Sequence, residues 1–502
     1  MTEEGERILR CVLGFDVGTS SSKAVLVALD GTVVDVETLV HEVSTPAPGF
    51  AEMDGAVWLR EFDTAARALL TRNPVELLAI GVSGMGPCLL LTDENDQPLA
   101  PAVLYGIDSR ATREIVELDA MLGEERLLHR CGATLSTQAI GPKVRWFARH
   151  APASHDQARR WYMPSSWLVR QLTGEYVLDF QSASQCTPMF DLRTRDWAID
   201  WCDLVAPRLE LPRLLDAGAI AGTTRGTLGG IAPGVPVLVG TIDAWAEAAS
   251  VGVGEPGDLM LMYGSTLFLV LYTAQSLRHP ALWSTAGLSR DESCLAGGMA
   301  TSGSLTSWIA RTTGRPIDEL EREALELDPG ADGLVLLPYF AGERTPILDP
   351  LARGVFAGLS LSHQPRHLFR AALESIAHGA RHNLETMASA GARPERVVAV
   401  GGGANSALWT QIVSDVTGLV QEIPTTTIGA SYGMAHLAAS AVADVAPIGE
   451  WNPVRERRVP DHDRSARYES MHRIYRALYP ATADLVHELA RMTPAPRSER
   501  LE

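Results

Sequence analysis

Cysteine is scarce in this chain and never occurs in the close pairs that bind zinc or form redox-active dithiols. The six cysteines are scattered along the 502 residues: Cys11, Cys88, Cys131, Cys186, Cys202 and Cys294. No CxxC pair is present, so the sequence predicts neither a zinc ribbon nor a thioredoxin-like motif. We expect buried free thiols, which are typical of a reducing compartment.

Long apolar runs are also lacking, and no run reaches the length that spans a bilayer. The first ten residues, MTEEGERILR, are acidic and polar, unlike a secretory signal peptide. These two features predict a cytoplasmic protein without a membrane partner.

Positive charge is in deficit, with 43 lysines and arginines against 61 aspartates and glutamates and a net charge of −18. This balance disfavours nucleic acid and anionic membranes as main partners, because both are polyanions. A length of 502 residues exceeds one ordinary core, so we expect two domains. The composition fits a soluble enzyme, in which a local basic spot can still hold phosphate.

Strands alternate with helices along the chain, which predicts the α/β class. Apolar spacing predicts helices over residues 115–130 and 367–391. The stretch GDLMLMYGSTLFLVLYTA (257–274) repeats the strand–turn–strand pattern of the opening residues, which indicates an internal duplication. A strand flanked by prolines near Pro236 marks the boundary, so we predict domains at 1–236 and 237–502.

The opening hairpin, GFDVGTSSSKAVLVALDG (14–31), carries more polar chemistry than a turn requires. Backbone N–H groups in a tight turn of small residues can bind an anion, and Thr19 and Ser20 add hydroxyl donors. Lys23 adds a positive charge, while Asp16 at the strand end suits a Mg²⁺ ion held partly through water. A polar hairpin with a capping aspartate is the open alternative.

Two later glycine turns extend this hypothesis. Gly264, Ser265 and Thr266 repeat the small polar turn, so two facing loops would hold one polyphosphate across a cleft between domains. In VGGGANSALW (400–409), glycines end a strand, and Asn405 or Ser406 can cap the next helix. This turn matches neither GxGxxG nor GxxxxGK[ST], so it is a surface for an adenine ring or a simple strand-to-helix turn.

Asp243 lies in GTIDAWAEAASVG (240–252), where a strand gives way to a helix of small residues. A carboxylate there can accept a hydroxyl proton, which phosphoryl transfer to an alcohol requires. An N-cap role for Asp243 is the open alternative.

Three further groups are weaker candidates. His378 and His382 lie four residues apart with Glu374 one turn earlier, but the absence of HExxH disfavours a metal site. Asp108 and Arg110 in YGIDSRA suit either sugar hydroxyls or a salt bridge. For Glu343 and Arg344 in GERTP, structural anchoring is the simpler interpretation.

These motifs, in this order, resemble the FGGY family of carbohydrate kinases, and the likeness covers nearly the whole chain. It is carried by GFDVGTSSSKAVLV, by GTIDAWAEAASVGVGEPGDLMLMYGST, by LPYFAGERTPILDPLARGVFAGL and by VGGGANSALWTQIVSDVTG. Within the family, the GERTP stretch is most similar to the xylulokinases. The resemblance implies the two-domain ribonuclease H-like fold of actin, hexokinase and the heat-shock ATPases, with an active-site cleft between the domains.

The resemblance also implies roles for matching positions, with ATP and Mg²⁺ as cofactors and a homodimer as the assembly. Asp243 matches the catalytic base, and Asp16 together with Asp243 lies near Mg²⁺. The positions that match nucleotide-binding residues are Thr19, Ser20, Lys23, Gly264, Ser265, Thr266, Gly402, Gly403 and Asn405. The positions that match the sugar pocket are Gly84, Met85, Asp108 and Arg110.

One departure from the xylulokinase pattern concerns the acceptor. Xylulokinases typically carry Gln-Met-His-Gly where this chain has Met85-Gly86-Pro87-Cys88, and often Asn where Ala244 follows Asp243. Both changes remove hydrogen-bonding groups from the sugar side. We therefore expect an ATP-dependent kinase of a pentulose such as D-xylulose, with ribulose, a polyol, a sugar acid or a hexose as alternative acceptors. A nucleotide-dependent regulator of the actin-like fold is the alternative outside enzymes.

Overall fold

The computed structural model describes residues 8–492. Most of the N-terminal stretch that was compared with a signal peptide therefore lies outside the described residues. Among those that are described, no helix combines the length and the apolar character needed to cross a membrane.

The first half of the chain builds a seven-stranded sheet that contains both an antiparallel hairpin and parallel strand pairs. β1 (Leu9–Val17) pairs antiparallel with β2 (Ser21–Ala28) and parallel with β5 (Val75–Gly84). The sheet order is β13-β14-β5-β1-β2-β3, and β15 also pairs with β5. The remaining strands are β3 (Val33–Val40), β13 (Ile220–Thr223), β14 (Pro236–Leu238) and β15 (Thr241–Ile242).

The second half repeats this arrangement in another seven-stranded sheet, of order β18-β19-β17-β16-β22-β23-β24. β16 (Asp258–Tyr263) pairs antiparallel with β17 (Leu267–Thr273) and parallel with β22 (Arg396–Val400), as β1 does with β2 and β5. The other strands are β18 (Trp283–Ala286), β19 (Ser293–Met299), β23 (Gln421–Pro424) and β24 (Val454–Arg458). The two hairpins recognised in the sequence thus occupy matching places, and the α/β class is confirmed.

The other strands of residues 8–492 form five two-stranded sheets. They are β4 (Glu52–Met53) with β7 (Ala102–Val103), β6 (Leu90–Thr92) with β8 (Arg160–Tyr162), β9 (Val177–Asp179) with β12 (Arg213–Leu215), β10 (Phe190–Asp191) with β11 (Asp196–Trp197), and β20 (Val335–Leu337) with β21 (Val355–Ala357).

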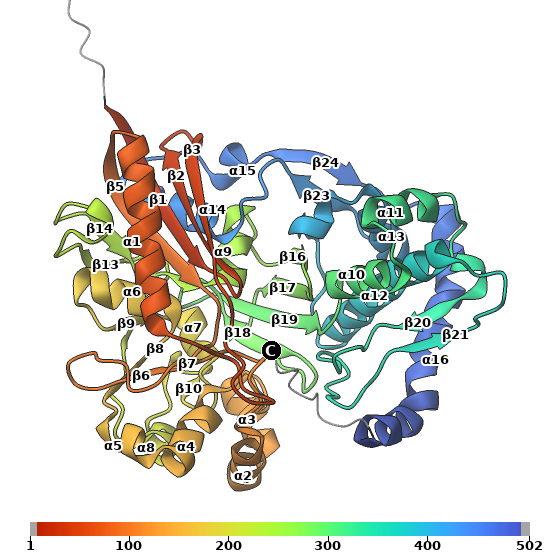
Figure 1. Ribbon diagram of the computed structural model, residues 1–502, viewed down its shortest axis with the longest axis horizontal. Helices are drawn as coiled ribbons and strands as arrows, with labels where there is room; N and C mark the ends of the chain where they lie inside the picture. The colour runs from red at the N-terminus through yellow and green to blue at the C-terminus, as the bar shows by residue number, and fades with distance from the viewer. Residues whose placement is uncertain (1–7, 493–502) are drawn as a thin grey trace, which may run out of the picture.

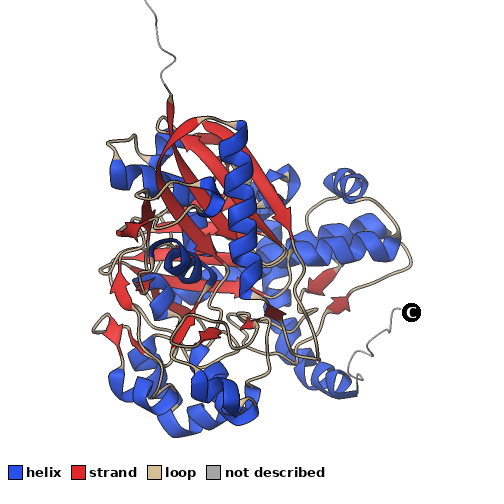
Figure 2. Cartoon of the chain, turned by 60° about the vertical axis from the view of Figure 1, so that its left-hand side comes forward, coloured by secondary structure: helices blue, strands red, loops and turns tan. Residues whose placement is uncertain are grey.

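Helices surround both sheets and gather at one end of the first half (Figures 1 and 2). In the first half they are α1 (Gly55–Arg72), α2 (Thr112–Leu122), α3 (Glu124–Cys131), α4 (Ile140–His150), α5 (Pro152–Gln157), α6 (Pro164–Thr173), α7 (Phe180–Ser184), α8 (Ile199–Val205) and the 3-10 turn η1 (Leu228–Gly230). Then follow α9 (Asp243–Ser250), α10 (Gly303–Thr313), α11 (Ile317–Leu325), η2 (Ala331–Gly333), α12 (Pro365–Ser389), η3 (Gly402–Asn405), α13 (Ala407–Thr417), α14 (Ala430–Val442), α15 (Ile448–Trp451) and α16 (His462–Met492).

The single helix expected over 115–130 is wrong, because α2 ends and α3 begins around Gly123. The backbone of Gly123 has φ +81°, and its N–H closes α2 on the Asp119 carbonyl. Glycine adopts this conformation at little cost, so it ends a helix whose apolar spacing continues on both sides.

The first sheet is covered on its two faces by helices from opposite ends of the chain. Phe15 of β1 packs edge-on against Phe62 of α1, with ring centroids 5.1 Å apart. On the other face lies α14, which Figure 1 shows in blue among the red strands of the first half. The neighbouring residues Gly14 and Gly81 of β1 and β5 let this helix approach the strands directly, because a Cβ on Gly14 would lie 1.8 Å from the Ser431 carbonyl oxygen.

The domain boundary at residue 236 stays a prediction. Strands β14 and β15, just around and after that position, pair with β5 in the first sheet. Helix α9 follows β15 and packs against α14, so this part of the chain lies where the two halves meet.

Candidate active site

The turn between β1 and β2 places a carboxylate, hydroxyls and a lysine together. Asp16 pairs with Lys23 across the hairpin, and the Ser83 hydroxyl of β5 donates to the Asp16 carboxylate over 2.8 Å. The Thr19 and Tyr105 hydroxyls lie 2.9 Å apart, and Ser20 at the tip of the turn is exposed. Burial raises the pKa of Asp16, against the opposing effects of Ser83 and Lys23.

Asp243 is the first residue of α9, immediately after β15. Within residues 8–492, its carboxylate accepts only the neighbouring Ala244 N–H, over 2.8 Å, and makes no N-cap bond to the helix. Burial is the main cause that raises the pKa of Asp243, to about 7, and the nearby Asp16 charge is the second. A carboxylate whose pKa is raised in this way is suited to act as a general base near neutral pH.

Sequence reasoning missed Glu247, which lies one helical turn after Asp243. Burial, and then the charge of Asp16, raise the pKa of Glu247 to about 7, while Lys23 opposes the shift. The i, i+4 spacing in DAWAE was the available signal, because such residues share one face of a helix.

Asp243 opens into a cavity of about 160 Å³, which we call the acceptor cavity. Residues from both halves of the chain form its walls. Most of its polar wall is uncharged, consisting of Tyr105, Thr134, Ser136, Gln138, Ser184, Gln185, Thr187, Thr266, Ser284 and Thr285. Its apolar wall includes Met85, Ile242, Trp245, Met262, Phe268 and Trp283. Hydroxyls and amides opposite aromatic faces can bind a small polyhydroxylated molecule.

The residues that the resemblance assigned to the sugar side fall into two groups. Met85 lines the acceptor cavity, and Gly84 lies just before it in the chain, where an added Cβ would lie 2.8 Å from the Pro164 side chain. Asp108 and Arg110 are not among the lining residues.

Asp108 and Arg110 bind each other through side-chain contacts as short as 2.7 Å. The Ala51 N–H also donates to Asp108, and Arg110 forms a second ion pair with Glu52. The arrangement is that of an internal anchor, and direct contact with a substrate stays a prediction.

A second cavity, of about 630 Å³, lies over the turn between β16 and β17; we call it the nucleotide cavity. Gly264, Ser265, Gly402, Gly403 and Asn405, all singled out from the sequence, line it.

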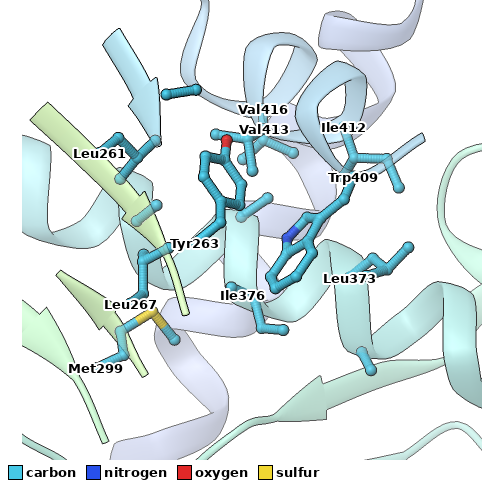
Figure 3. Packing of buried hydrophobic residues seen from close by; sticks show 14 of the residues in the cluster. Leu261, Tyr263, Leu267, Met299, Leu373, Ile376, Trp409, Ile412, Val413 and Val416 are labelled. Carbon is cyan, nitrogen blue, oxygen red and sulfur yellow. The ribbon is translucent and has the colours of Figure 1, made fainter. Parts of the chain in front are cut away.

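Part of the hydrophobic core of the second half, drawn in Figure 3, borders this cavity. Tyr263, Leu373 and Trp409 line the cavity and belong to this core. The rings of Tyr263 and Trp409 meet at 90°, with centroids 5.2 Å apart. Ser406 caps α13, since its hydroxyl accepts the backbone N–H of Trp409 over 3.0 Å. The cap fixes the backbone at the start of α13, and the Trp409 ring packs against Gly403 of the glycine turn, where a Cβ would lie 2.5 Å from the ring.

The β16–β17 turn separates the two cavities. Gly264 and Ser265 line the nucleotide cavity, whereas Thr266 lines the acceptor cavity. A phosphate chain that passes along this turn would reach from one cavity toward Asp243 in the other. This juxtaposition allows transfer of a phosphoryl group between two bound molecules.

The histidines considered as metal ligands, His378 and His382, lie on α12, where His378 faces α16. Glu374 is occupied by Arg370, 2.7 Å away, and the His378 ring nitrogen lies 3.3 Å from that of His472. Within residues 8–492, no group of three or more His, Cys, Asp or Glu side chains is placed to hold a metal ion.

Comparisons with known proteins agree with this architecture. The model of the "FGGY family of carbohydrate kinases, N-terminal domain" matches residues 11–252, and that of the C-terminal domain matches 259–442. A xylulose kinase of Escherichia coli is 30% identical over 483 residues, which cover 93% of this chain and 98% of that protein. A glycerol kinase of Nocardia farcinica is 31% identical over 398 residues, covering 75% and 78%. The crystal structure of xylulose kinase from Rhodospirillum rubrum superposes with a TM-score of 0.88 at 31% identity, covering 95% of this chain and all of that one.

Proposed function

Because this chain belongs to the FGGY family of carbohydrate kinases, we propose that its acceptor is a pentulose such as D-xylulose. The family establishes the coarser activity: the protein is an ATP-dependent sugar kinase of the actin- and hexokinase-like fold. Membership of a family of kinases disfavours the alternative that the protein is a nucleotide-dependent regulator of the actin-like fold. The pentulose assignment is supported by the xylulose kinases among its relatives and by the mainly uncharged polar wall of the acceptor cavity.

The observation that carries the proposed mechanism is the turn shared by the two cavities. ATP would lie with its adenosine in the nucleotide cavity, over Gly402, Gly403 and Asn405, and with its phosphates between the two hairpin turns. The acceptor hydroxyl would lie against Asp243. This carboxylate takes the proton as the oxygen attacks the γ-phosphorus, and ADP leaves.

Asp16 and Asp243 fit the Mg²⁺ ion that we propose as a cofactor. Mg²⁺ is usually held by one or two carboxylates together with substrate phosphates and water, rather than by a cage of protein ligands. Asp16 raises the pKa of Asp243, so the two carboxylates lie within electrostatic reach and a cation would relieve their repulsion. When bound, the ion would neutralise charge on the phosphates. Thr19, Ser20 and Lys23, which lie in the same hairpin as Asp16, would bind the phosphates beside it.

A polyol is the second candidate acceptor. A glycerol kinase is among the relatives, and Pro87 and Ala244 stand where xylulokinases carry polar side chains. Location in the cytoplasm and assembly as a homodimer stay predictions from the sequence.

Release of ADP from Mg-ATP across pentuloses, polyols, sugar acids and hexoses tests the acceptor. We expect one pentulose to give the highest kcat/KM, far above the rate without acceptor. A higher kcat/KM for glycerol or another polyol would replace the pentulose with the second candidate.

The activity of the free enzyme should fall on acidification. Burial raises the pKa of Asp243 to about 7, and the base acts only when deprotonated, so kcat/KM should drop about tenfold per pH unit below that point. For stability the sign is reversed: a raised carboxyl pKa favours folding at acidic pH, and this contribution is lost as the pH rises through about 7.

A profile of kcat/KM between about pH 5.5 and 9 checks this expectation. Glu247→Gln is the matched variant: the Glu247 charge helps to raise the pKa of Asp243, so its removal should move the acidic limb to lower pH. A profile that stays flat to the acidic end would contradict the raised pKa.

Gly402→Val should block the nucleotide without disturbing the fold. A Cβ at Gly402 meets no heavy atom within 4 Å, and this residue lines the nucleotide cavity. We expect KM for ATP to rise roughly tenfold or more, a loss of at least ~1.4 kcal/mol of binding, with KM for the acceptor unchanged. Gly226→Val, at an equally open position outside both cavities, is the control. An unchanged KM for ATP would show that the glycine turn at Gly402 does not bind the nucleotide.

A further inference from the structure

One cation in the acceptor cavity has no role in the mechanism above. Arg344 lies in the loop between β20 and β21 and lines the cavity together with Asp243 and Thr266. Among residues 8–492, the guanidinium of Arg344 has neither a carboxylate within ion-pair distance nor a hydrogen-bond acceptor. A partly buried cation left unpaired in a catalytic cavity is suited to an anion that arrives with the substrates.

The backbone that carries Arg344 is fixed on both sides by buried contacts. Before it, the Glu343 carboxylate accepts the N–H groups of Ala300, over 2.9 Å, and of Arg344 itself, over 2.7 Å.

After it, the Thr345 hydroxyl accepts the Gly298 N–H and donates to the Asn383 amide, each over 2.6 Å. These partners belong to β19 and α12, the framework of the second half. Glu343 and Thr345 therefore anchor the loop, while the Arg344 side chain between them lines the cavity. The anchoring role expected from the sequence for Glu343 and Arg344 holds for Glu343, and Thr345 supplies the second anchor.

Arg344 lines the acceptor cavity and is linked to the first phosphate turn through Tyr105. Tyr105, which also lines the cavity, is within electrostatic reach of both Asp243 and Arg344. The Tyr105 hydroxyl in turn contacts Thr19 of the β1–β2 turn. Thr266 of the β16–β17 turn completes the set, so Arg344 shares one cavity with the base and with contacts to both turns.

We propose that Arg344 is a catalytic residue that binds the phosphoryl group during its transfer. This inference rests on the proposed role of Asp243 as base. The acceptor oxygen forms a bond to the γ-phosphorus, the bond from that phosphorus to the oxygen bridging to the β-phosphate breaks, and Asp243 takes the hydroxyl proton. Arg344 donates to the equatorial oxygens, where negative charge is spread in the transition state. A positioned cation of this kind acts on kcat more than on substrate binding.

Arg344→Ala and Arg344→Lys test the proposal. Arg311→Ala is the control, since Arg311 is an exposed arginine of the same half of the chain and lines neither cavity. For Arg344→Ala we expect kcat to fall roughly 10²- to 10³-fold, with KM for ATP and acceptor within about threefold. Added guanidinium ion should restore at least part of the lost rate, and lysine should retain more activity than alanine. Melting temperature should stay that of the wild type.

Hydrolysis of ATP by water to ADP and phosphate, measured without a sugar acceptor, should fall by a similar factor. This reaction needs no sugar, so a wrong assignment of the acceptor would leave this arm intact, and the two proposals fail separately. The role of Arg344 is overturned if kcat stays within about threefold of wild type, or if only KM for the acceptor rises, which would make Arg344 a sugar ligand. A fall in kcat together with a lowered melting temperature and no rescue by guanidinium would make it a structural residue.

Discussion

Asp243→Asn is expected to lower kcat roughly 10²- to 10⁴-fold, the usual contribution of a positioned general base. Asparagine keeps the shape of the side chain and an oxygen for the Ala244 N–H, which is the only hydrogen-bond donor to this carboxylate among the described residues. It cannot take the proton of the attacking hydroxyl. Because Asp243 lines the acceptor cavity and not the nucleotide cavity, affinity for ADP should change by no more than about threefold.

Steady-state kinetics with the best acceptor, together with calorimetric titration of ADP, measure both quantities. Glu247→Gln is the matched control, since it removes one carboxylate from the same helix one turn away, outside the acceptor cavity. We expect this control to keep kcat within about tenfold of wild type. If Asp243→Asn retained more than a tenth of the wild-type turnover, Asp243 would not be the base.

Gly14→Ala is expected to have the largest effect on stability. The new methyl group would lie 1.8 Å from the Ser431 carbonyl oxygen and 2.9 Å from the Ala435 nitrogen, both in the backbone of α14. Backbone cannot rotate away as a side chain can, so the helix must move off the sheet, at a cost of about 3 kcal/mol or more.

This displacement should also lower kcat. Helix α14 packs closely on α9, where a Cβ on Gly433 would lie 2.0 Å from the Ala246 carbonyl oxygen. Since α9 begins at Asp243, a shift of α14 moves the base relative to the cavity.

Scanning calorimetry of Gly14→Ala beside Gly226→Ala measures the effect. Gly226 has no atom within 4 Å of its would-be Cβ, so its melting temperature should stay close to that of the wild type. Should Gly14→Ala fail to yield folded protein while Gly226→Ala does, the expectation still stands. A Gly14→Ala melting temperature within about a degree of wild type would contradict the close contact.

Several features were predictable because they depend on short stretches of chain. The hairpins at Asp16 and at Gly264–Thr266, the Asp243 helix start and the glycine turn before α13 follow from strand patterns, turn residues and caps. Ordered motifs also carried the family, which the matches to both FGGY domains confirm. Only the helix over 115–130 was wrong locally, where one glycine outweighed continuous apolar spacing.

The sequence by itself determined the kinds of chemical groups available: a base, phosphate-binding turns and a glycine surface, each set by backbone rules that act within a few residues. Tertiary structure decided which groups meet. Packing of α14 onto the first sheet and the presence of Asp243 and Arg344 in one cavity join segments about 100 or more residues apart. The ion pair of Arg110 with Glu52, about 60 residues earlier, holds the Asp108–Arg110 pair outside the cavity lining. Such contacts arise from the burial of whole surfaces, whose free energy depends on shape complementarity that no local pattern contains.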